Sequence, residues 1–93
     1  MRVKVFLPLP LRTLANGKKV IELEGETVGE VINNLFEKYY RLGKFIGTDG
    51  GRIKSTINIY LNGKDVRFLR DEEKIIGIED QLKIIPTIAG GRD

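Results

Sequence analysis

Few side chains in this sequence are suited to catalysis. The 93 residues contain no histidine and no cysteine, so the commonest general base, the commonest zinc ligand and the thiolate nucleophile are all missing. Thr48, Asp49 and Ser55 lie in one glycine-rich stretch with no evident base nearby, and such residues are typical turn formers. The sequence therefore argues against an independent enzyme.

Two further segments have residue types that can bind ions. The acidic run Asp71, Glu72 and Glu73 offers oxygen ligands for a hard cation, although a solvated loop is the commoner role of such a run. The glycine-rich segment 43–51 could cradle a phosphate, but we expect a strand to follow it and the Gly-Lys-Ser/Thr ending is absent. We therefore expect a surface loop there, and no bound metal or cofactor.

The most distinctive candidate is the pair Gly90 and Gly91, which follows the last apolar run and precedes Arg92 and Asp93. Two residues without a Cβ can pass through a narrow channel, because φ is unrestricted and no side chain touches the walls. Pro86 cannot donate to a strand ladder and should help the chain leave a sheet. Glycines near a carboxyl end can also mean only disorder, so the pair alone leaves both interpretations open.

Length and charge place these residues in one small domain. The formal net charge is +3, and the basic residues are scattered among acidic ones, which does not suggest a nucleic-acid surface. The apolar runs are only a few residues long, far short of the roughly 20 needed to cross a bilayer. We expect a cytoplasmic protein with no nucleic-acid or membrane partner.

The apolar pattern predicts the elements that position these residues. Alternation and the turn signals Asn16-Gly17 and Asn62-Gly63 predict strands over residues 1–9, 18–24, 55–62, 65–68 and 82–86, the first two as an antiparallel hairpin. A capping box, in which Thr27 accepts from Glu30 and the Glu30 carboxylate returns to the Thr27 amide, predicts a helix over 28–41 that ends near Gly43. Residues 69–81 should form a loop or short helical turn held by Ile75, Ile76 and Ile78.

This ββαββ order favours an α+β fold, a mixed sheet with one helix on one face. Its connectivity resembles the β-grasp fold of ubiquitin, which implies that the last strand lies parallel to the first, with the third strand on its other side. We expect a β-grasp domain over residues 1–88 and a flexible tail over 89–93. Alternation then predicts a core formed by the helix stripe and by Val3, Val5, Leu7, Ile57, Ile59, Leu61, Leu82 and Ile84.

The neighbours of these core residues should point to the uncovered face of the sheet. Phe6, Tyr60 and Ile85 would lie side by side there as a candidate partner-binding patch. The cations Lys4, Lys83 and Arg67 on the same face would favour an acidic partner surface. Scattered exposed apolar residues, or a monomer that pairs weakly as a dimer through this face, are the alternatives.

Two stretches identify the family that the chain resembles. Residues 58–68, NIYLNGKDVRF, and residues 81–91, QLKIIPTIAGG, are similar to the ubiquitin-like sulfur carriers of the MoaD and ThiS group, and most similar to the branch that contains the cysteine-biosynthesis carrier CysO. The resemblance covers nearly the whole chain. It implies that an activating enzyme uses ATP to adenylate the carboxylate of Gly91, after which a sulfur donor replaces the adenylate to give a thiocarboxylate.

The resemblance also implies partners. The thiocarboxylate would pass its sulfur to a biosynthetic enzyme for cysteine or cofactor synthesis, and a JAMM-type protease would act on the carrier. A carrier of this kind needs no catalytic side chain, because the adenylate supplies the leaving group that the ionised carboxylate lacks.

One departure from this family pattern concerns Arg92 and Asp93. They place the carbonyl of Gly91 in a peptide bond, so we expect a protease, plausibly of the JAMM type, to cut between Gly91 and Arg92 before activation. Two alternatives stay open: a ubiquitin-like modifier joined to target lysines through Gly91, and the small subunit of molybdopterin synthase.

Overall fold

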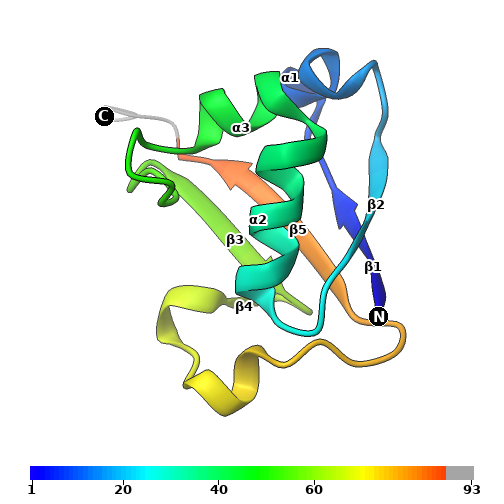
Figure 1. The fold of residues 1–93 in the computed structure, drawn as a ribbon, viewed down its shortest axis with the longest axis vertical. Helices are drawn as coiled ribbons and strands as arrows, with labels where there is room; N and C mark the ends of the chain where they lie inside the picture. The colour runs from blue at the N-terminus through cyan, green and yellow to red at the C-terminus, as the bar shows by residue number, and fades with distance from the viewer. Residues whose placement is uncertain (88–93) are drawn as a thin grey trace.

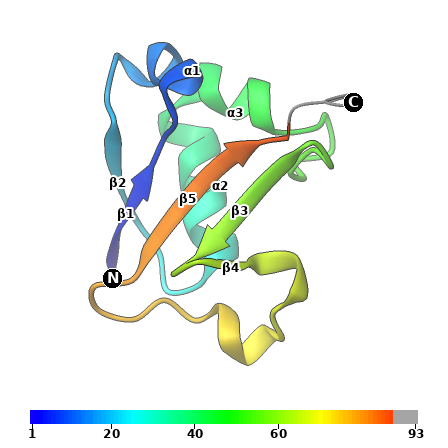
Figure 2. The same cartoon turned by 180° about the vertical axis from the view of Figure 1, so that it is seen from behind.

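A computed structural model describes residues 1–87, and all structural statements below concern these residues. They form one mixed five-stranded sheet with helices on one face (Figures 1 and 2). The strands are β1 (Arg2–Phe6), β2 (Val20–Glu24), β3 (Ile57–Leu61), β4 (Lys64–Asp65) and β5 (Gln81–Pro86). The helices are α1 (Leu9–Arg12), α2 (Val28–Lys38) and α3 (Tyr40–Ile46), with short 3-10 turns at Thr13–Ala15, Val66–Phe68 and Asp71–Lys74.

The strand order is β2-β1-β5-β3-β4, as the β-grasp resemblance implied. β5 runs parallel to β1, with Val5 beside Leu82, and antiparallel to β3, with Ile59 beside Ile84. The last strand therefore occupies the centre of the sheet, and Figure 2 shows the face on which no helix lies.

The core has the predicted composition. All eight strand residues expected to face the helix are buried, at most 5% exposed. The predicted apolar stripe of the helix joins them: Phe36 is partly buried, and the other five members are buried, namely Val28, Val31, Ile32, Leu35 and Tyr39. The predicted cap differs in one partner: Thr27 Oγ1 accepts from the N–H of Glu30 at 3.1 Å, but the Glu30 carboxylate accepts from the N–H of Glu26 instead of Thr27, at 2.8 Å.

The prediction of a single helix ending near Gly43 is wrong. The helix is interrupted at Tyr39, whose backbone is not helical (φ −122°, ψ 76°). A second helix, α3, follows, and in it Leu42, Gly43 and Ile46 are buried. Position 43 needs a glycine although it is helical, because α3 packs closely against Phe36: a Cβ on Gly43 would lie 2.9 Å from Phe36 Cδ1. Here tertiary contact outweighs the weak helix propensity of glycine.

The connection between β1 and β2 is also longer than the predicted hairpin. The strands are antiparallel as expected, but β1 ends at Phe6, and α1 and a 3-10 turn follow before the chain reverses at Asn16 and Gly17, whose φ angles of 58° and 79° match the turn signal. Leu11 and Ala15 make this connection part of the core, because both are fully buried.

The segment between β4 and β5 is irregular, as predicted, but fewer residues hold it than expected. β4 covers only two residues and gives way to a 3-10 turn where a longer strand was predicted. Ile76 is buried and its N–H donates to the carbonyl of Glu26 at 2.9 Å, whereas Ile75 and Ile78 are mostly exposed. Of the three isoleucines predicted to hold this segment, only Ile76 is buried in the core. In residues 1–87 no helix is long and apolar enough to cross a membrane.

Candidate functional site

The candidate docking residues lie on the sheet face opposite α2, which we call the open face. Lys83 of β5 pairs with Phe6 of β1 on one side and with Tyr60 of β3 on the other. Ile85 lies one pleat further along β5, opposite Asn58. Because side chains of paired residues project from the same face, Phe6, Tyr60 and Ile85 surround Lys83 instead of forming one continuous apolar row. Phe6 and Tyr60 are half-buried, and Ile85 is 41% exposed.

The basic residues of the open face differ in their surroundings. Lys4 lies opposite Glu22 of β2, a carboxylate that forms an ion pair with Arg2 at 3.3 Å. Arg67 is held by Asp65 in an ion pair of 2.9 Å. Lys83, between two aromatic residues, takes part in no ion pair within residues 1–87. It is therefore the cation best placed to meet an acidic group on a partner.

A chain of polar side chains crosses the open face beside these residues. Asp65 Oδ1 accepts from the backbone N–H of Arg67 at 2.9 Å and from its Nε at 3.2 Å, and Asp65 Oδ2 accepts from Nη2 at 2.9 Å. Nη2 also donates to Asn58 Oδ1, and Asn58 Nδ2 donates to Thr87 Oγ1 at 3.0 Å. This polar chain connects the turn after β4 with the residue that follows β5.

The Asp65 and Arg67 charges stabilise each other. The side-chain hydrogen bond from Arg67, and then the bond from its backbone N–H, hold the pKa of Asp65 below its ordinary value. The same side-chain bond raises the pKa of Arg67. Both groups are therefore charged at neutral pH, and the ion pair keeps the guanidinium oriented towards Asn58.

Thr87 is the last residue that the structure describes and lies two positions before the predicted tail, residues 89–93. β5 ends at Pro86, as predicted, and one further hydrogen bond follows it: the N–H of Thr87 donates to the carbonyl of Thr56 at 2.6 Å. On the side of β5 that faces β3, hydrogen bonds are made by Gln81 and Thr87. Because bonded and non-bonded pairs alternate in an antiparallel ladder, Pro86 lies in a non-bonded pair, and its missing N–H removes no hydrogen bond to β3. Gly90, Gly91 and Arg92 lie outside the described residues.

Sequence reasoning missed three members of this site. It placed Arg67 on the open face but did not single out Asn58, Asp65 or Thr87. Alternation does put Asn58 on that face, and Asp65 and Arg67 have the spacing at which an aspartate caps a turn, its carboxylate accepting from an N–H two residues on. The bond to Thr87 has no local signal, because the two residues are 29 positions apart.

The other ion-binding candidates have structural roles. Arg70 Nε lies 3.4 Å from carboxylate oxygens of both Glu72 and Glu73, and in residues 1–87 no three acidic residues are grouped so as to hold a metal. In the glycine-rich segment Thr48 closes a turn, its Oγ1 accepting from the N–H of Arg52 at 3.3 Å. The expectation of a surface loop holds for residues 48–51, which are exposed, but not for residues 43–46, which belong to α3 and include the buried Gly43 and Ile46.

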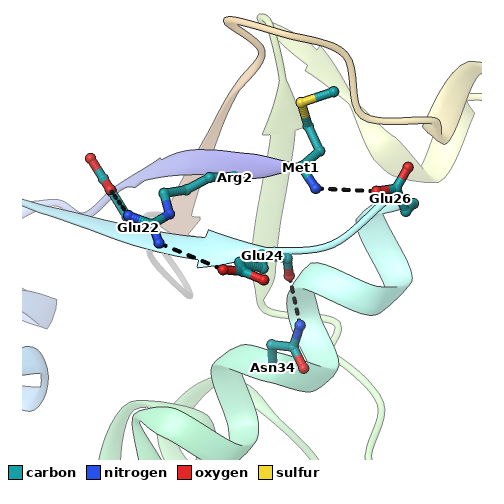
Figure 3. A network of polar contacts seen from close by, with 6 residues as sticks. All are labelled: Met1, Arg2, Glu22, Glu24, Glu26 and Asn34. Atoms are coloured by element: carbon teal, nitrogen blue, oxygen red, sulfur yellow. Dashed lines mark hydrogen bonds and ion pairs between the residues drawn. The ribbon is translucent and has the colours of Figure 1, made fainter.

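A groove of about 730 Å³ lies at the other edge of the sheet, between β2 and α2. Figure 3 shows residues that line it: Arg2 lies between Glu22, at 3.3 Å, and Glu24, at 3.5 Å, and Asn34 Nδ2 donates to the carbonyl of Glu24 at 2.6 Å. These contacts tie the edge strand to the helix. In the sheet order, β1 lies between the β2 edge with this groove and β5.

The sheet order, with the helices on one face, defines a ubiquitin-like β-grasp protein. The chain belongs to the ThiS family, whose model matches residues 5–91. The sulfur carrier protein CysO of Mycobacterium tuberculosis is 33% identical over 93 residues, which cover 98% of this chain and 100% of that protein. The chain is therefore a CysO-like sulfur carrier, a small protein carrier and not an enzyme.

Two solved structures extend this likeness. A chain of the Amycolatopsis orientalis BexX/CysO complex is 34% identical with a TM-score of 0.80, over 96% of this chain and 99% of that one. Small archaeal modifier protein 1 of Methanosarcina acetivorans is 33% identical with a TM-score of 0.82, over 97% of this chain and 96% of that one. The first structure is thus of a complex, and the second protein carries the name of a protein modifier.

Proposed function

We propose that the working group of this carrier is the carboxylate of Gly91, released when a JAMM-type protease hydrolyses the bond between Gly91 and Arg92. The carboxylate then attacks the α-phosphorus of ATP on an activating enzyme, giving an acyl adenylate and pyrophosphate. A sulfur donor displaces AMP, and the thiocarboxylate transfers its sulfur to a biosynthetic enzyme for cysteine or cofactor synthesis. The observation that carries this proposal is the family match, which extends to Gly91 and excludes Arg92 and Asp93.

The open face supplies the docking surface for the activating enzyme in this proposal. Phe6, Tyr60 and Ile85 provide apolar contact, and Lys83 at their centre selects an acidic group on the partner. The groove at the β2 edge is less suitable, because ion pairs among its own residues already occupy it.

The decisive experiment compares two forms of the protein. The full 93-residue chain and a chain ending at Gly91 are each incubated with the activating enzyme, ATP and sulfide, and intact mass is measured. Only the shorter chain should gain the mass change of oxygen replaced by sulfur. A full-length chain that reacts equally well would refute the need for a cut.

A matched variant tests the role of the glycine itself. Gly91→Phe in the shorter chain should abolish the reaction, because a bulky side chain blocks a narrow channel. Its melting temperature should stay unchanged, since the core is formed by residues between Val3 and Ile84. A large loss of stability would instead give the glycine a structural role.

A second function is favoured by the likeness to the Methanosarcina acetivorans modifier protein. In that case the activated carboxylate of Gly91 would be joined to lysine side chains of other proteins. Digestion of proteins from the native cells would then yield lysines that carry remnants of the carrier's tail. Their absence under conditions in which the thiocarboxylate is present would leave sulfur transfer as the only role.

A further inference from the structure

The polar chain from Asp65 to Thr87 has a fixed direction. A guanidinium has only donors, so Arg67 requires the oxygen of the Asn58 amide to face it. That choice turns the amide NH₂ of Asn58 towards Thr87, whose hydroxyl oxygen accepts at 3.0 Å. Asp65 holds the guanidinium through two hydrogen bonds and the backbone N–H of Arg67 through a third, so the orientation of the whole polar chain is set beside β4.

Thr87 is restrained on two sides as a result. Its N–H donates to the Thr56 carbonyl at 2.6 Å, and its side chain is held by Asn58. The residue before it is Pro86, whose ring fixes its own φ, and threonine itself is stiff at χ1 because it is branched at Cβ. Thr87 is nevertheless exposed, so these bonds do not serve to bury it.

This restraint lies three residues before Gly90. Backbone and side-chain ordering opposes binding, and a segment that is already oriented in the free protein loses less freedom when it enters an active site. A restrained residue at the start of a glycine-containing tail reduces the range of directions in which that tail can extend.

We propose, building on the function proposed above, that Arg67, Asn58 and Thr87 are positioning residues that set the direction in which β5 presents the Gly-Gly tail to the activating enzyme. They touch none of the reacting atoms. Their effect comes before chemistry, in the fraction of encounters that bring the tail to the channel of the enzyme.

Kinetics of the chain ending at Gly91 test this proposal, with pyrophosphate exchange into ATP catalysed by the activating enzyme from the same cells. Thr87→Val keeps the shape, the branching and the backbone N–H but removes the acceptor. We expect KM for the carrier to rise roughly three- to tenfold with kcat nearly unchanged, because ordering is lost before binding. Thr87→Ser keeps the hydroxyl acceptor, so its KM should equal that of the unaltered chain ending at Gly91.

A second variant separates positioning from docking. Arg67→Lys keeps the positive charge on the open face but loses the fork that orients Asn58. If Arg67 acts through Thr87, the double variant Arg67→Lys, Thr87→Val should raise KM no further than Thr87→Val alone. Multiplicative effects would show that Arg67 contacts the partner independently, and would overturn the proposal for Arg67.

Amide hydrogen exchange of the full chain gives a readout that needs no partner. The Thr87 N–H should exchange faster in Thr87→Val and Arg67→Lys than in the unaltered protein, with the amides of β1 unchanged. Unchanged exchange at Thr87, or an unchanged KM in Thr87→Val, would overturn the proposal. If the unaltered chain ending at Gly91 supports no pyrophosphate exchange, the proposed function fails, and amide exchange still decides whether these residues order the start of the tail.

Discussion

Asp65 accepts hydrogen bonds from both the backbone N–H and the guanidinium of Arg67, each at 2.9 Å. The carboxylate thus caps the 3-10 turn after β4 and orients the arginine at the same time. One ion pair at the sheet edge therefore determines both the course of the chain and the position of a cation on the open face.

This pair should make stability depend on pH in the acid range. The pKa of Asp65 is lowered in the folded state, so its contribution is complete above the ordinary aspartate pKa, about 3.9, and is lost as pH falls through the lower folded value. Asp65→Asn should therefore melt at a lower temperature than the unaltered protein at pH 6, with the difference shrinking below about pH 4. Asp49→Asn, in the exposed glycine-rich turn, is the matched control for replacing a carboxylate with an amide. A constant difference down to the lowest pH would contradict the assignment.

The close contact between Gly43 and Phe36 gives a test of the second helix. Gly43→Ala would place a Cβ 2.9 Å from Phe36 Cδ1 and 3.1 Å from Phe36 Cα. Since the backbone cannot easily retreat, we expect destabilisation of about 1–3 kcal/mol by chemical denaturation, as for overpacking.

Gly29→Ala is the matched control, because that glycine is also helical and an added Cβ there would come no closer than 3.8 Å, to Thr27 Oγ1. There the gain in helix propensity should stabilise the protein by about 0.5–1 kcal/mol. Equal effects of the two substitutions would show that packing against Phe36 does not decide the course of α3.

The bond from Asn34 to the carbonyl of Glu24 should stabilise the edge strand. Asn34→Ala loses this 2.6 Å bond but gains helix propensity, so its effect alone is ambiguous (Figure 3). Asn33→Ala, at the exposed neighbouring position, has the same propensity gain without the loss. We expect Asn34→Ala to be less stable than Asn33→Ala by about 1 kcal/mol in denaturant titration. Equal stabilities would show that the bond adds nothing to folding.

Sequence reasoning was reliable where one physical rule governs a segment. Burial on one face of a sheet imposes alternation. The positions of Val3, Val5, Ile57 and Ile59 therefore predicted both the strands and the face to which these side chains point. It failed at Gly43, because propensity describes an isolated helix and the contact with Phe36 is tertiary.

The site shows the same limit. Alternation was enough to place Phe6, Tyr60 and Ile85 on one face. The presence of Lys83 between the aromatics depends on the register of a parallel pair, and the bond from Asn58 to Thr87 depends on a diagonal between strands. Neither register nor diagonal contacts leave a periodic signal in the sequence.

The open face can be tested as a docking surface by inserting charge. Phe6→Asp and Tyr60→Asp place a carboxylate beside Lys83 and remove apolar contact area, so both should weaken binding to the activating enzyme about tenfold or more. Lys83→Glu should mainly slow association, with an effect that decreases as salt is raised. Binding is measured by surface plasmon resonance with the chain ending at Gly91.

Tyr40→Asp is the matched control for these aromatic substitutions. Tyr40 is 68% exposed on α3, on the helical side of the molecule, so it should affect neither affinity nor association rate. Far-ultraviolet circular dichroism establishes that each variant is folded, which matters most for the half-buried Phe6. If Phe6→Asp and Tyr60→Asp bind as Tyr40→Asp does, the partner docks elsewhere, and the β2 edge with its groove becomes the next surface to test.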